Sequence, residues 1–150
     1  MGDVPDGEVD PDTGHCCAAI EGDCAPASCV TFLWAAGVVT TEKHLHYALG
    51  MGGPDGTTAA GVEAALGVML AGKPWTTEVE YTFDPTESQP RALLLGYVKS
   101  TGNGHMVAVL PGPGGAWLHD PADDERQLLP WDQIAALKPN IVIRLVPRAL

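Results

Sequence analysis

One cysteine stands where a helix is expected to begin, and this position favours reactivity. Cys24 lies in the segment GDCAPASC, where Pro26 suits the first turn of a helix because its missing backbone N–H is not needed there. A thiol at this end of a helix meets the aligned peptide dipoles, which stabilise the thiolate. Cys24 is therefore a candidate nucleophile, and a small unreactive core cysteine is the alternative.

A base and a residue to orient it stand near two later predicted strands. His105 follows the glycine-rich turn 102–104 and opens the apolar run MVAVL, so its side chain is expected at the rim of a sheet. Asp120 ends the next predicted strand in the sequence WLHDP, and a short hairpin would bring it beside His105. Cysteine catalysis needs a thiolate, a base and a group that orients the base. Cys24, His105 and Asp120 are the predicted catalytic set, although each alone also fits a structural role.

The elements that must position these residues divide into helices followed by strands. The residues 25–36 are apolar in nearly every direction around a helix axis, which indicates a buried central helix beginning at Cys24. Shorter helices are predicted over 41–49, 58–70 and 131–137. Strands are predicted over 78–83, 92–98, 106–110, 116–119 and 141–146. This order predicts an α+β fold with helices packed on an antiparallel sheet.

The chain length of 150 residues fits one domain with a substantial core. The first residues repeat Asp, Pro and Gly without apolar periodicity. We therefore predict a flexible N-terminal arm over 1–19 and a folded domain over 20–150.

The charge balance limits the partners. Nineteen acidic and eight basic residues give a net charge of −11, which disfavours nucleic acid and anionic membrane surfaces as partners. No apolar stretch approaches the ~20 residues that span a bilayer, and no secretory signal pattern opens the chain. The four cysteines lie in the first fifth of the sequence, where bridges would close only short loops. We expect reduced thiols and a cytoplasmic protein, with export or release by another route left open; oligomeric state is not indicated.

The order of these motifs resembles the papain-like cysteine peptidases, above all the bacteriocin-processing peptidase domains of peptide exporters and their stand-alone or phage-encoded relatives. Those domains carry Asp-Cys-Gly-Pro-x-Ser/Cys at a helix start, where this chain has DCAPAS over 23–28. Their Gly-Thr/Ser segment is matched by DGTT over 55–58, and their His strand by HMVAV over 105–109. WLHDP over 117–121 and the predicted helix over 131–137 match their Asp-Pro strand end and terminal helix. The likeness spans about 20–146.

This resemblance implies a papain-like fold and a cysteine peptidase or related amide hydrolase. It implies a thioester acyl-enzyme on Cys24, with His105 moving the proton and Asp120 holding His105. The implied partner is a peptide or protein substrate with small residues, often glycine, at the scissile bond. Deamidation, isopeptide cleavage and peptidoglycan amide hydrolysis use the same chemistry and stay open.

The chain departs from the family pattern at the oxyanion hole. The family places a Gln about six residues before the Cys, where this chain has Cys17, Ala18 and Ala19, and no Gln precedes Cys24. The backbone N–H groups of Cys24 and Ala25 are the predicted replacement. The missing donor also leaves open a catalytically degenerate papain-like fold that serves as a binding or structural module.

No cofactor and no built metal site are predicted. Histidine and cysteine residues do gather near the N-terminus, but the repeated ligand pairs of structural zinc sites are absent. Adventitious zinc on an exposed arm at His15, Cys16 and Cys17 is the most that this cluster indicates. His44 and His46 point apart at two-residue spacing and are predicted to be surface residues.

Overall fold

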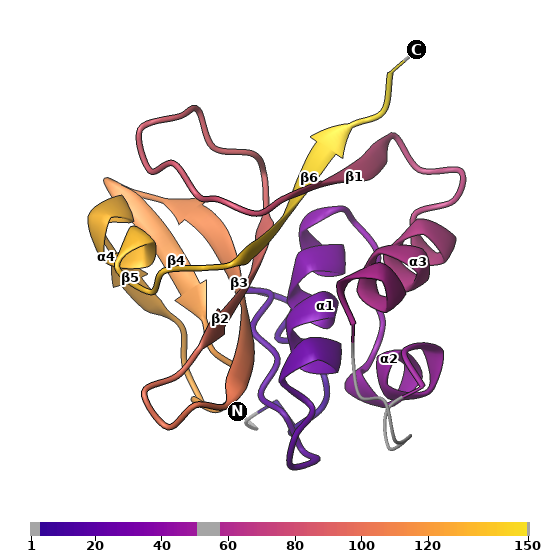
Figure 1. Cartoon of the computed structure of the whole chain (residues 1–150). Helices are drawn as coiled ribbons and strands as arrows, with labels where there is room; N and C mark the ends of the chain where they lie inside the picture. The colour runs from indigo at the N-terminus through magenta and orange to yellow at the C-terminus, as the bar shows by residue number, and fades with distance from the viewer. Residues whose placement is uncertain (1–3, 51–57, 150) are drawn as a thin grey trace.

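A computed structural model describes residues 4–50 and 58–149 of the chain (Figure 1). Three helices come first along the chain, α1 (Cys24–Ala35), α2 (Glu42–Ala48) and α3 (Ala59–Met69). The remaining elements are β1 (Trp75–Glu80), β2 (Leu93–Val98), β3 (Gly104–Gly112), β4 (Gly115–His119), β5 (Gln127–Leu129), α4 (Trp131–Ala135) and β6 (Ile141–Pro147). This is the α+β order that the sequence predicts.

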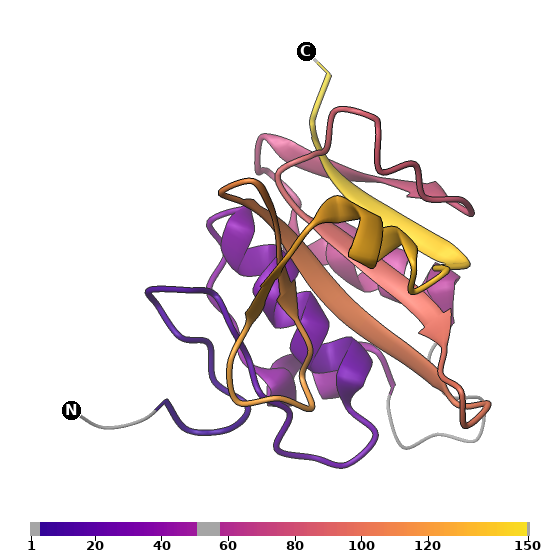
Figure 2. The same cartoon turned by 90° about the vertical axis from the view of Figure 1, so that its left-hand side faces the viewer.

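The strands form one antiparallel sheet in the order β1-β6-β2-β3-β4-β5. Alternate residues of each strand point to opposite faces of the sheet. Leu94 and Ala108 belong to the core under α1, whereas Leu93 and Val107 belong to a second core that contains Ile134 of α4. Figures 1 and 2 show α1 lying against one face of the sheet and α4 on the opposite side.

Helix α1 is the centre of the larger core. Its residues Ala25 to Leu33 are all buried, which confirms the prediction from its continuous apolar run. The helix packs on β2 and β3 and is flanked by α2 and α3. Gly37, just past its end, has a φ of 82°, a left-handed conformation that glycine adopts without strain.

Two strands differ from the sequence-based expectation. β1 begins at Trp75 rather than Glu78, because its register is set by pairing with β6 from Trp75↔Pro147 to Glu80↔Val142. β5 was not predicted, since three residues are too few for an alternating pattern. Residues 55–57 of the DGTT motif lie outside the part of the chain that the structure describes.

Residues 4–19 pack against the rest of the chain, although the sequence there predicts a flexible arm. Cys16 and His15 are buried, and the backbone N–H of Ala18 donates to the carbonyl of Pro121 at 2.9 Å. Gly14 lies so close to the indole of Trp34 that a Cβ would overlap the ring. Apolar periodicity does not reveal contacts of this kind, because single buried side chains and backbone hydrogen bonds make them.

None of the helices in the described residues has the length and apolar character needed to cross a membrane.

Candidate active site

Cys24 is the first residue of α1, and its environment stabilises the thiolate. Burial raises the pKa of this thiol, but the hydrogen bond with His105, the backbone N–H of Met106 and the charge of His105 lower it further than burial raises it. The net pKa is lower than that of an ordinary cysteine. The three other cysteines have raised pKa values, about 12 for Cys16, 11 for Cys17 and 12 for Cys29, with burial as the largest cause in each.

His105 and Asp120 lie together, as the predicted hairpin requires. His105 is the second residue of β3, and Asp120 follows the last residue of β4. The Nε2 atom of His105 lies 2.8 Å from Oδ1 of Asp120. This pairing fixes the tautomer, because a nitrogen that donates to a carboxylate carries the proton and leaves Nδ1 for the thiol.

The same contacts favour the charged forms of both His105 and Asp120. Hydrogen bonds with Asp120 and Cys24 raise the pKa of His105 to about 9, although burial alone would lower it. Burial raises the pKa of Asp120, but its hydrogen bonds with His105 and the backbone N–H of Ala122 bring the net pKa below the ordinary value. These directions favour the charged forms of Cys24 and His105 relative to an isolated cysteine and histidine.

A serine one turn along α1 holds the helix against the strand that carries His105. Ser28 is buried, and its hydroxyl donates to the carbonyl of Met106 at 3.0 Å. The N–H of Met106 is directed at the sulfur of Cys24. The residue after His105 therefore contacts α1 through both of its backbone polar groups.

Tyr97 of β2 covers the imidazole and was not singled out in the sequence. It is paired directly with His105 across the antiparallel ladder, and the two rings meet edge to face with centroids 5.6 Å apart. Burial, followed by the charges of Asp120 and Cys24, raises the pKa of Tyr97. Only the strand register could have revealed this neighbour, and a single sequence does not fix that register.

Two N–H groups at the start of α1 have no backbone acceptor among the described residues, namely those of Cys24 and Ala25. Pro26 has no N–H, and the N–H of Ala27 donates to the carbonyl of Asp23. The side chain of Asp23, which precedes the helix, makes no capping hydrogen bond. Asp23 therefore caps neither of the two groups predicted as oxyanion donors, and the N–H of Ala25, like that of Met106, is directed at the sulfur of Cys24.

Asp23 instead pairs with a histidine that the sequence assigned to the surface. Nδ1 of His46 lies 2.8 and 2.9 Å from the two carboxylate oxygens of Asp23. The prediction for His46 is therefore wrong, whereas His44 is exposed as expected. The spacing argument excluded only a shared face for the two histidines, and it did not consider the partner of each one separately.

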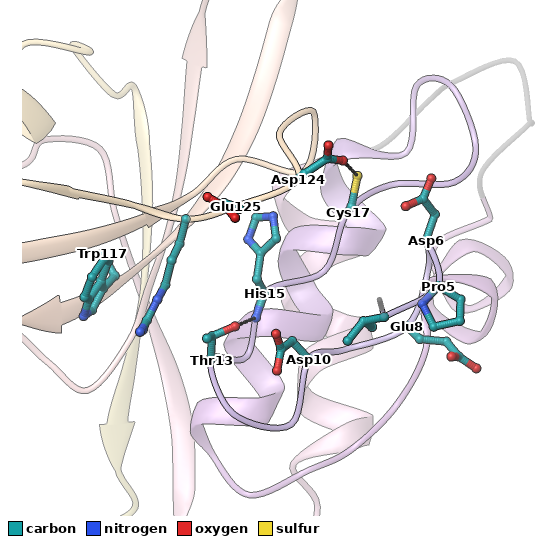
Figure 3. Close-up of a pocket in the computed structure, with 12 residues that line it drawn as sticks. Pro5, Asp6, Glu8, Asp10, Thr13, His15, Cys17, Trp117, Asp124 and Glu125 are labelled. Atoms are coloured by element: carbon teal, nitrogen blue, oxygen red, sulfur yellow. Dashed lines mark hydrogen bonds between the residues drawn. The ribbon is translucent and has the colours of Figure 1, made fainter. Parts of the chain in front are cut away.

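A cavity of about 670 Å³ lies away from Cys24 and His105, between residues 4–17 and the turn 124–126 (Figure 3). His15 and Cys17 line it, together with Trp117, over whose ring the guanidinium of Arg126 stacks. Acidic side chains that include Asp6 and Asp124 also face it.

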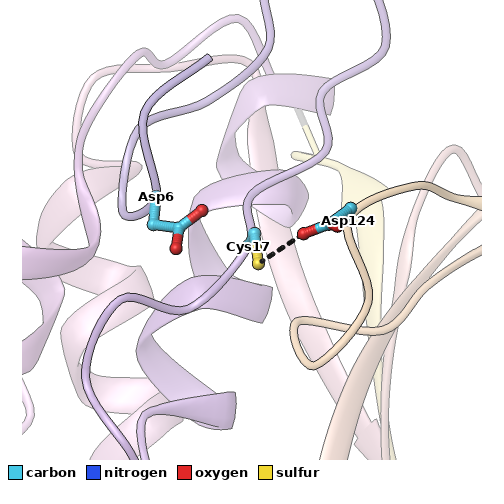
Figure 4. Close-up of side chains that lie close together, drawn as sticks. All are labelled: Asp6, Cys17 and Asp124. Atoms are coloured by element: carbon cyan, nitrogen blue, oxygen red, sulfur yellow. Dashed lines mark hydrogen bonds between the residues drawn. The ribbon is translucent and has the colours of Figure 1, made fainter. Parts of the chain in front are cut away.

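Within that cavity, Asp6, Cys17 and Asp124 bring one ligand atom each to within 4.8 Å of one another (Figure 4). The sulfur of Cys17 lies 3.8 Å from Oδ1 of Asp124. The exposed zinc cluster considered from the sequence does not form, because His15 and Cys16 are buried.

Comparison with solved structures identifies similar folds. The peptidase domain of Streptococcus ComA, a bi-functional ABC transporter involved in a quorum-sensing pathway, matches with a TM-score of 0.66 at 14% identity, covering 95% of this chain and 98% of that one. A double-glycine-motif protease from an AMS/PCAT transporter, solved in complex with a leader peptide, also has a TM-score of 0.66, at 15% identity and 99% coverage of both chains. The Streptococcus mutans ComA peptidase domain matches with a TM-score of 0.55 at 15% identity, covering 87% and 97%.

The sequence itself matches no protein-family model and no curated protein at a significant level. The chain thus shares the α+β fold of these peptidase domains, and its α1 begins at Cys24.

Proposed function

We propose that this protein is a cysteine peptidase in which Cys24 is the nucleophile, His105 the acid and base, and Asp120 the residue that orients His105. The observation that carries the proposal is the pairing of His105 with Asp120 at 2.8 Å beside a cysteine whose pKa is lowered. Of the four thiols, only that of Cys24 lies at the start of α1 and has hydrogen bonds that lower its pKa against the effect of burial.

The reaction proceeds through a thioester. The thiolate of Cys24 attacks the peptide carbonyl carbon, and the carbonyl π electrons move to oxygen, where the N–H groups of Cys24 and Ala25 would hold the oxyanion. The oxyanion collapses to the thioester as the C–N bond breaks, and the His105 imidazolium gives its proton to the leaving amine. Water then attacks the thioester while His105 accepts one of its protons, and the second oxyanion collapses to release the carboxylic acid and to restore the Cys24 thiolate and the His105 imidazolium.

The proposed substrate is a peptide with glycine at the scissile bond. The support is the fold shared with a double-glycine-motif protease that was solved with a leader peptide. A fluorogenic peptide that ends in Gly-Gly before the reporter amide tests this directly, because hydrolysis releases the reporter. We expect hydrolysis by the native protein and none by Cys24→Ala, while replacing the two glycines with leucines should abolish the signal.

Thiol reactivity tests the nucleophile without any assumption about the substrate. At pH 6 we expect iodoacetamide to alkylate Cys24 well before Cys16, Cys17 or Cys29, because only Cys24 has a lowered pKa. Peptide mapping by mass spectrometry after timed quenching measures the four rates. His105→Ala should remove the preference, whereas His44→Ala, which alters an exposed histidine, should retain it.

The same experiment separates the peptidase from the degenerate binding module. A module without activity predicts slow and equal labelling of the accessible thiols, and it predicts no hydrolysis of any peptide. Equal labelling at pH 6 in the native protein would exclude the activated thiolate and with it the proposed mechanism.

A further inference from the structure

The backbone that leads into Cys24 is held by two side chains of α2. Glu42 and His46 are four residues apart, so they lie on the same face of that helix, one turn from each other. α2 packs on α1, and this face is directed at residues 19–23. Neither residue belongs to the set that carries out the proposed reaction.

Glu42 binds the backbone at the start of this segment. Its side chain is buried, and its two carboxylate oxygens accept the N–H groups of Ala19 at 2.6 Å and Ile20 at 3.1 Å. A carboxylate that accepts two backbone donors makes strong charge-assisted hydrogen bonds and fixes the direction of both peptide units. Burial, followed by a hydrogen bond with Asp23, raises the pKa of Glu42, while the N–H groups of Ala19 and Ile20 oppose this rise.

His46 binds the other end of the segment. Its Nδ1 atom pairs with both oxygens of Asp23, whose side chain is 1% exposed, while His46 itself is partly exposed at 21%. The side chain of Asp23, paired in this way, makes no hydrogen bond with the N–H groups at the start of α1. A carboxylate that capped α1 would occupy those groups and would place a negative charge beside the thiolate.

The residues held in this way directly follow the position at which the family carries its glutamine. The position six residues before Cys24 is Ala18, which has no polar side chain, and its N–H donates to Pro121 next to Asp120. Any oxyanion stabilisation here must therefore come from backbone N–H groups, and such donors act only if the backbone is rigid and correctly directed.

We propose that Glu42 and His46 are positioning residues that direct the backbone N–H groups at the start of α1 toward the oxyanion. This inference rests on the proposed function, and it concerns the step in which the carbonyl oxygen becomes negative. The titratable groups near Glu42 and His46 are the carboxyl group of Asp23 and, next to Glu42, the thiol of Cys16. Neither residue contacts the reacting atoms, so their effect passes through the backbone of 19–24.

The test compares two reactions of the same thiol. Acylation by p-nitrophenyl acetate forms an oxyanion and releases p-nitrophenolate, whereas alkylation by iodoacetamide displaces iodide without forming one. Both rates are measured per thiolate over a pH series, with the signal of Cys24→Ala subtracted to remove the contribution of other thiols. The variants are Glu42→Gln and His46→Gln, and the matched controls are Glu63→Gln and His44→Gln, which alter exposed helical residues.

We expect acylation to fall about ten- to a hundredfold in Glu42→Gln and His46→Gln, the scale of effect known for displaced or lost catalytic donors. Alkylation per thiolate should stay within about twofold of native, and the controls should match native in both reactions. Hydrolysis of the Gly-Gly peptide should show the loss in kcat rather than in KM.

Other outcomes overturn the inference. Equal loss of both reactions would assign the two residues to general stability, and no loss in either would show that they do not direct the donors. His46→Gln is the milder change, because His46 is partly exposed, and it decides the question if Glu42→Gln does not fold. If the native protein alkylates selectively at Cys24 but is not acylated, the proposed function fails instead.

Discussion

At the scale of single residues, burial and hydrogen bonding act in opposite directions on the pKa values of the Cys24 thiol and the His105 imidazole. Burial disfavours charge on both, but the contact between them and the carboxylate of Asp120 favours a charged pair. The proposed peptidase activity is therefore expected to be limited on the acid side by protonation of the thiolate and on the alkaline side by deprotonation of His105 at a pKa of about 9.

Asp120→Asn is expected to shift the alkaline limit. Without the carboxylate, the largest cause of the raised pKa of His105 is gone, so the alkaline limb of kcat/KM should move from about pH 9 toward 6.5. Activity at the optimum should fall on the order of 10²–10⁴-fold, because the imidazole loses its tautomer and orientation. The pH profile of Gly-Gly peptide hydrolysis measures both effects.

Asp132→Asn, an exposed change in α4, should leave this profile unchanged. An alkaline limb that remains near pH 9 in Asp120→Asn would contradict the assigned pairing of the carboxylate with His105.

At the scale of elements, the site is a junction between α1 and β3. The helix contributes the thiol and the backbone N–H groups of Cys24 and Ala25, and the strand contributes the base and the N–H of Met106. Ser28 joins the two by its hydrogen bond to the Met106 carbonyl. The site therefore depends on the spacing of one helix and one strand more than on any loop.

Ser28→Ala should loosen this junction. It removes a partly buried hydrogen bond to the Met106 carbonyl, which is expected to cost about 1 kcal/mol of unfolding free energy. Urea unfolding followed by fluorescence measures this loss. Ser100→Ala, which alters an exposed residue, should change it by less than about 0.5 kcal/mol. Equal stabilities of Ser28→Ala and the native protein would exclude a role for this hydrogen bond.

The sequence predicted this junction better than it predicted its surroundings. α1 could be located because an apolar run, Pro26 and Gly37 agree on its limits, and the His105 strand because a glycine turn precedes an apolar run. Glu42 and His46 could not be assigned in this way, since their partners Ala19, Ile20 and Asp23 lie on another segment. Their four-residue spacing was visible, but spacing on one helix does not name a partner elsewhere.

At the scale of the whole molecule, the N-terminal segment closes over the end of the sheet. Nε2 of His15 lies 2.7 Å from the carbonyl of Asp123 and donates to it, so its Nδ1 accepts from Nδ1 of His119 at 3.1 Å. Nε2 of His119 is buried without a partner among the described residues. Burial, followed by the nearby His15 and Arg126, lowers the pKa of His119 to about 3.

This closure should make the fold sensitive to acid. A histidine with a lowered folded pKa takes up its proton more readily when unfolded, so its contribution to stability is complete above about pH 6.5 and declines as the pH falls toward 3. Urea unfolding at a series of pH values should show the unfolding free energy decreasing below pH 6.5.

His119→Leu should be less stable at pH 8, since His15 loses its donor, and should have a weaker pH dependence between 6.5 and 4. A native-like slope in this variant would assign the acid sensitivity to other groups. His44→Leu serves as the control, because that histidine is exposed.

The residues of the proposed active site are far apart in the sequence, and this has a consequence during synthesis. Cys24 leaves the ribosome before His105 and Asp120, because it precedes both of them in the sequence. Until β3 docks on α1, the thiol has neither its hydrogen bonds nor its base and behaves as an ordinary cysteine. On the proposed mechanism, a nascent chain that lacks β3 therefore has no activated thiol, and activity requires the docking of β3 on α1.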